Sequence, residues 1–158
     1  MNHQALINAY AAQAETPRRW IHGLSPEQLH AHPIPGTWSI HALVVHCLDS
    51  DLIATHRMRR IAAEELPLLI GYDETAFARQ PWYEAADLGT VCDLFAVHRR
   101  FTAQWLASIP ADAWGRAGIH NQRGKITIAT MVPMYIEHID HHARFLADKR
   151  RALGKPLN

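Results

Sequence analysis

The chain has 158 residues and a formal net charge of +1 at pH 7, and hydrophobic residues make up 48% of it. A chain of this length and apolar content can bury a sizeable core in one domain, which excludes extensive disorder. The near-neutral charge offers no field to attract nucleic acid or a membrane surface, so we expect neither as a partner. Twelve histidines stand out, because about three or four would be usual.

Cysteine usage points to a reducing compartment. Cys47 and Cys92 have no C-x-x-C spacing, and each lies in an apolar helical pattern, so we expect two reduced thiols. The N-terminus lacks a basic start followed by an apolar run, and no apolar stretch approaches the roughly 20 residues that span a bilayer. We therefore expect a cytoplasmic protein.

The first half of the chain predicts two long helices joined by a turn-rich stretch. A helical pattern covers residues 2–22, and S-P-E-Q-L then begins a short helix with Ser25 as its N-cap. A second long helix begins after Thr37 or Ser39 and runs to about residue 66, where Pro67 stops it.

The second half predicts two more long helices. Residues 67–87 look irregular, and a third helix covers residues 88–109. A loop at residues 114–125 precedes a fourth helix over residues 127–153, in which Pro133 would kink or displace the first turns.

Four long amphipathic helices without an alternating strand or an internal repeat are typical of one architecture. We expect an all-α, single-domain four-helix bundle over residues 1–158, with long second and third connections.

Two of the histidines in the last helix should face the bundle interior. His138 and His142 are one turn apart, a spacing that places both imidazoles on one helical face. His141 lies at the flank of that face. Three further residues fall within about 60° of His138, namely Met131, Tyr135 and Phe145.

The second helix offers a third imidazole on its apolar face. His46 falls in the stripe of Leu43, Ser50, Ile53, Arg57 and Ile61. His41 and His56 lie more than about 100° away on the helical wheel and are expected to face solvent. Asp49, one turn from His46, could be a fourth ligand or a partner of a ligand.

His46, His138 and His142 together favour a metal site built between facing helices, although hydrogen-bonded core histidines stay an alternative. Imidazole suits zinc, nickel, copper, iron or cobalt, and three protein ligands with open positions are typical of a catalytic site. The helix does not match the H-E-x-x-H pattern of zinc proteases, because Ile139 follows His138.

Two more residues are candidates for substrate binding. Arg57 shares the face of His46 and could bind a carboxylate, or it could form an ion pair within the bundle. Tyr135 could hydrogen-bond a substrate, or it could pack in the core. Cys47 lies about 100° around the helix from His46, too far round to be a ligand.

The stretch P-G-T-W-S-I-H-A-L-V-V-H, with Trp38 eight positions before His46, resembles the signature of the DinB/YfiT-like family. H-I-D-H-H resembles the late H-x-x-x-H pair of that family, and S-P-E-Q-L, Arg57-x-Arg59 and G-K-I-T extend the likeness over about residues 20–150. The resemblance implies a four-helix bundle in which three histidines and water hold one divalent metal ion, most often nickel or zinc. It also implies that a homodimer is common.

Within that family, bacillithiol S-transferases and mycothiol-dependent maleylpyruvate isomerase use low-molecular-weight thiols. The resemblance therefore favours a metal-dependent thiol S-transferase that acts on a small electrophile. A metal-dependent hydrolase and a non-catalytic, stress-linked metal-binding protein are the alternatives, because a fold does not fix a function.

Overall fold

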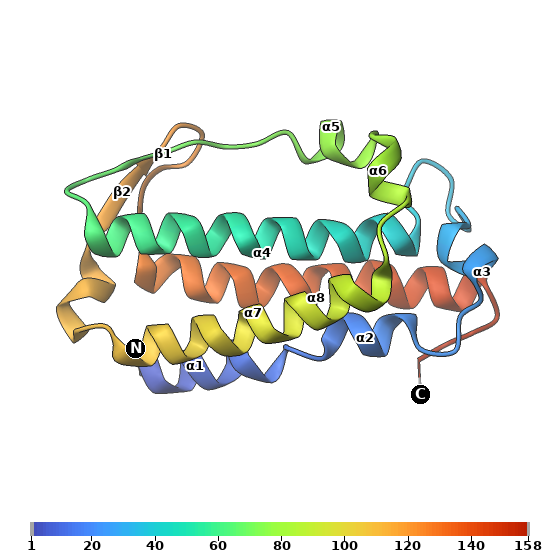
Figure 1. Ribbon diagram of the computed structural model, residues 1–158, viewed down its shortest axis with the longest axis horizontal. Helices are drawn as coiled ribbons and strands as arrows, with labels where there is room; N and C mark the ends of the chain where they lie inside the picture. Colours follow the sequence, from blue (N-terminus) through green and yellow to red (C-terminus); the bar gives the residue numbers. More distant parts are fainter. Residues whose placement is uncertain (1, 158) are drawn as a thin grey trace.

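A computed structural model describes residues 2–157 and shows a bundle of four long helical segments (Figure 1). The segments are α1 (His3–Ala12) with α2 (Thr16–Ile21), α4 (Ile40–Ala63), α7 (Leu88–Ser108) and α8 (Ile128–Ala152). The four-helix bundle is thus confirmed. Met1 and Asn158, the ends of the expected domain, lie outside the described residues.

The long connections follow from the order of the helices. α4 and α7 are neighbours that run in the same direction, so the chain must return along the whole bundle between them (Figure 1). The 24 residues of α4 span about 36 Å at 1.5 Å per residue. The return segment carries β1 (Leu68–Leu69), α5 (Glu74–Ala78) and α6 (Pro81–Glu84), while α3 (Pro26–His30) precedes α4.

A small sheet at one end of the bundle corrects the expectation of no strands. β2 (Ala117–His120) pairs in parallel with β1 and antiparallel with β3 (Gly124–Thr127), and a short 3-10 helix (Ala111–Gly115) comes before it. A side chain at Gly118 would meet the Pro67 carbonyl oxygen at 2.9 Å, so glycine permits the close pairing. Strands of two to four residues are too short to show alternation in a sequence.

Two proline positions also differ from expectation. The single helix expected over residues 2–22 is broken after Ala12, because in a continuous helix Pro17 would clash with the carbonyl of Gln13. Pro133 neither displaces nor shortens α8, which begins at Ile128 with Thr127 as N-cap. Pro133 is the sixth residue of α8 and has no N–H to donate to the Ala129 carbonyl, yet the helix continues through this position.

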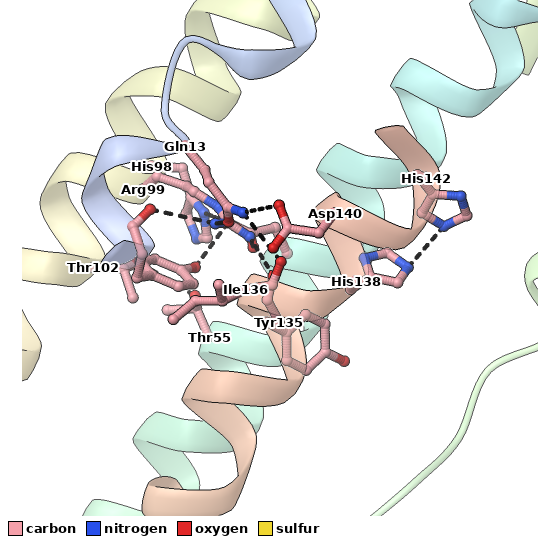
Figure 2. Close-up of polar contacts among 12 residues, drawn as sticks. Gln13, Thr55, His98, Arg99, Thr102, Tyr135, Ile136, His138, Asp140 and His142 are labelled. Atoms are coloured by element: carbon pink, nitrogen blue, oxygen red, sulfur yellow. Dashed lines mark hydrogen bonds and ion pairs between the residues drawn. The ribbon is translucent and has the colours of Figure 1, made fainter. Parts of the chain in front are cut away.

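A buried polar layer divides the core into two apolar halves. The Asp51 carboxylate accepts hydrogen bonds from the Arg99 guanidinium at 2.8 Å and from the Tyr10 hydroxyl at 2.9 Å. Arg99 also donates to the backbone carbonyl of Tyr135 at 2.9 Å and to the Gln13 side chain at 2.7 Å (Figure 2). All four helical segments of the bundle therefore meet at one ion pair.

Of the helices within residues 2–157, none combines the length and the apolar character that crossing a membrane requires.

Asp51→Asn should lower the free energy of unfolding by about 3–5 kcal/mol, because it leaves the Arg99 guanidinium buried without its counter-ion. Urea unfolding would measure the loss. Asp51→Asn combined with Arg99→Met should recover much of it, since the double variant buries no charge. Equal stability of Asp51→Asn and the natural chain would contradict the role given to this layer.

The pair of Asp51 and Arg99 should also affect how the stability of the protein depends on pH. Burial alone would raise the pKa of Asp51, but Arg99 and His98 outweigh it and hold that pKa below its ordinary value. The ionised carboxylate therefore stabilises the fold above the unfolded-state pKa of about 3.9, and this contribution is lost as pH falls toward the lowered value. Between pH 7 and pH 2, Asp51→Asn should lose less stability than the natural chain.

Candidate metal centre

Three imidazoles from two helices meet at one point between α4 and α8. The Nε2 atom of His138 lies 3.2 Å from Nε2 of His46 and 3.0 Å from Nε2 of His142. Figure 2 shows His138 and His142 side by side on α8, joined by this contact. The structure thus brings together the three residues that the sequence singled out as ligands.

The neighbouring elements explain why the rings hold this arrangement. His46 is buried, with 1% of its surface exposed, and the ring of Trp38 packs 5.0 Å from its ring. Trp38 precedes α4, whose first turn is fixed by Ser39 as N-cap. On α8, the ring centroids of His138 and His142 are 4.5 Å apart and nearly perpendicular, as the one-turn spacing allows.

The surroundings keep all three rings neutral. Burial, with His138 nearby, lowers the pKa of His46 to about 3. Burial and the Arg99 guanidinium lower the pKa of His138 to about 4. Burial, followed by the other two imidazoles, lowers the pKa of His142 to about 3. Neutral imidazole is the form that binds metal ions.

The geometry fits a divalent ion. A tetrahedral site with nitrogens 2.0–2.1 Å from zinc places those nitrogens about 3.3 Å apart, close to the 3.0 and 3.2 Å observed. The buried Nδ1 atoms of His46 and His142 find no hydrogen-bond partner among residues 2–157. A cation would use the Nε2 lone pairs, which converge on one point, and each ring would then carry its proton on Nδ1.

Glu74 is a site residue that the sequence did not reveal. Its carboxylate oxygen lies 3.8 Å from Nε2 of His46, and its side chain is 55% exposed. Glu74 is the first residue of α5, in the return segment read as irregular. The sequence carried no periodic signal there, so only the packing of the return segment against α4 could reveal it.

A cavity of about 700 Å³ opens beside His138, one of the three imidazoles. His138, Glu74, Tyr135 and Arg57 all line it, and the exposed His141 lies at its edge. Arg57 forms no ion pair with any carboxylate of residues 2–157. Its Nη1 lies instead 3.5 Å from the Tyr135 hydroxyl, so both residues expected to bind substrate border the same space.

Two expectations for neighbouring residues need correction. His41 is buried, with 4% of its surface exposed, because α3 and α6 cover the start of α4. His56 is exposed as expected. Phe145 is 44% exposed and does not belong to the core face, because its ring lies against the exposed His141 while the adjacent Leu146 points into the core. Asp49 is half-buried and is not among the groups that converge at the three imidazoles.

His41 belongs to a second cluster with His30 and Glu84. The Glu84 carboxylate already accepts from Nδ1 of His30 at 2.7 Å and from the Ser39 hydroxyl at 2.9 Å. The rings of His30 and His41 are stacked, 4.4 Å apart and 23° from parallel. Ligand lone pairs lie in the ring plane, so stacked rings do not aim at a shared ion. These contacts instead join α3, the start of α4 and α6 to one another.

Comparisons with known proteins support the fold. The family model of the DinB superfamily matches residues 9–146. The Bacillus subtilis relative named "Putative metal-dependent hydrolase YfiT" is 27% identical over 134 residues, covering 83% of this chain and 74% of the relative. "Putative metal-dependent hydrolase OB0782" of Oceanobacillus iheyensis is 28% identical over 119 residues, covering 75% and 69%.

A solved structure of Bacillus subtilis YfiT superposes with a TM-score of 0.90 at 20% identity, covering 96% of this chain and 87% of that chain. At that identity the likeness concerns the fold, which it supports over almost the whole chain.

Untagged protein loaded with zinc, nickel or manganese should retain about one ion per chain after desalting, measured by mass spectrometry of the metal. His46→Ala, His138→Ala and His142→Ala should each weaken the affinity at least about tenfold, because each removes a ligand. His141→Ala is the matched control and should change it little. A larger loss in His141→Ala than in His142→Ala would overturn the ligand set.

Proposed function

The chain belongs to the DinB superfamily, and from that premise we propose that it is a metal-dependent hydrolase of a small molecule, with His46, His138 and His142 as ligands. The observation that carries the proposal is the convergence of three neutral imidazoles, one of which, His138, lines an open cavity. Three ligands leave positions for water and substrate, whereas structural zinc sites are closed by four. The names of the relatives support the same class of reaction.

A bound divalent ion would supply Lewis-acid polarisation of the scissile group and a lowered pKa for the attacking water. Glu74 is placed to accept the proton of that water, because its carboxylate lies 3.8 Å from a ligand nitrogen and reaches the cavity. Tyr135 and Arg57 would hold the part of the substrate farther from the ligands.

The cavity argues against a purely structural role. A non-catalytic metal-binding protein would be expected to close its site with a fourth protein ligand. Here the space beside His138 is about 700 Å³, enough for a small molecule. Thiol S-transfer, the choice of nickel or zinc, and a homodimer stay predictions of the family resemblance, and a cytoplasmic location stays a prediction of the sequence.

The metal-loaded protein should hydrolyse at least one member of a panel of esters, amides and phosphoesters without any thiol. Glu74→Gln should lower kcat by about 10²- to 10⁴-fold, the usual contribution of a general base, with the metal content unchanged. Glu65→Gln, an exposed carboxylate away from the cavity, is the control.

Two outcomes would contradict this proposal. Turnover that requires both a low-molecular-weight thiol and an electrophile would establish thiol transfer instead. A full metal content without turnover on either panel would favour the non-catalytic alternative.

A further inference from the structure

The cavity has a positively charged end, set apart from the three imidazoles. Arg57 lies there, 11 positions after His46 on α4, and only 7% of its surface is exposed. The side chain of Tyr135 lies between Arg57 and His138. Its ring centroid is 5.8 Å from that of His138, and its hydroxyl is 3.5 Å from Nη1 of Arg57. The ligands and the guanidinium are therefore about one tyrosine side chain apart.

The charge of Arg57 is not neutralised by the protein. Among residues 2–157 its partners are the Ile70 carbonyl, which accepts from Nη2, and the Tyr135 hydroxyl, while its buried Nε has none. Burying a charge without a counter-ion is costly, and buried charges in proteins are normally paired. A guanidinium left unpaired at the wall of a cavity indicates that the counter-ion comes from outside the chain.

Two other arginines are buried, and the partners of their guanidinium groups differ from those of Arg57. Arg99 has Asp51 as its counter-ion at 2.8 Å. Arg150 donates to three backbone carbonyls, at distances of 2.7 to 3.1 Å, and does not border the cavity. Arg57 has neither a carboxylate partner nor three backbone acceptors, so packing alone does not explain why this arginine is buried.

His120 adds a neutral donor to the same end of the cavity. Its place on β2 turns it toward the interior, with 5% of its surface exposed. The backbone N–H of Gln122 donates to its Nδ1 at 3.2 Å, which leaves the proton of the neutral ring on Nε2. Burial, with Arg57 and Arg123 nearby, lowers the pKa of His120, so the ring is a hydrogen-bond donor without a charge of its own.

We propose that Arg57, with the Tyr135 hydroxyl and His120, binds a carboxylate of the substrate, several bonds away from the group that reacts at the three histidines. The inference rests on the proposed function and narrows it to substrates that carry a carboxylate. The planar guanidinium offers the fork that a carboxylate matches, and two neutral donors from α8 and β2 complete the set. A neutral substrate would leave the buried charge uncompensated.

Hydroxamates provide a test that does not require turnover, because the hydroxamate group binds divalent metal ions. The probes are acetohydroxamate, a series of ω-carboxyalkyl hydroxamates of increasing chain length, and the matching ω-amides. Calorimetry on zinc-loaded protein would measure each affinity. At the best chain length the carboxylate should bind at least about tenfold tighter than its amide, as hydrogen bonds to a charged group allow.

In Arg57→Gln that ratio should fall to about one, while acetohydroxamate binds as before. Arg59→Gln is the matched control, because Arg59 lies on the same helix but packs on the rings of Phe101 and Trp105 outside the cavity. Its ratio should equal that of the natural chain. If Arg57→Gln does not fold, Arg57→Lys replaces it, and the ratio should fall several-fold because the ammonium lacks the fork.

The outcomes separate the two proposals. Failure of acetohydroxamate to bind the zinc-loaded natural chain would contradict the metal centre itself. Binding of acetohydroxamate without any preference for the carboxylate over the amide, at any chain length, would overturn the carboxylate site alone. A preference that survives in Arg57→Gln would do the same.

Discussion

The ion pair between Asp51 and Arg99 is the interaction on which the rest of the structure depends. It joins α4 to α7, while Tyr10 attaches α1 and the Tyr135 carbonyl attaches α8. His46 is five positions before Asp51, and His138 is three positions after Tyr135. The layer that fixes the axial register of α4 and α8 thus also fixes the distance between the imidazoles. A slip of one turn, about 5.4 Å, would separate them.

The position of the metal centre beside this layer has an electrostatic consequence. A charged pair in the core is costly to bury, and its cation contributes to the lowered pKa of His138. Burial is the first cause of the lowered pKa of all three rings, so the imidazoles are neutral at ordinary pH. Arg99, which pairs with Asp51 in the core, thus also contributes to the neutral state of His138.

Helical periodicity was enough to predict most of the fold and the three converging histidines. His138 and His142 share a face by spacing alone, and His46 lies in the apolar stripe of the facing helix. Most of what the sequence could not reveal lies outside the periodic segments. Glu74 and His120 reach the cavity from a return segment and a short strand, whose positions depend on tertiary packing. His41 is buried for the same reason, since α3 and α6 cover a face that looks exposed on a helical wheel.

The central claim is that three imidazoles of this chain hold one divalent ion and leave positions open. X-ray absorption at the zinc edge tests it most directly, because the spectrum counts imidazole nitrogens and reports their distances. The account predicts three imidazoles at about 2.0–2.1 Å, with oxygen in the remaining positions. A shell with two imidazoles or fewer, or one closed by a fourth imidazole, would contradict it.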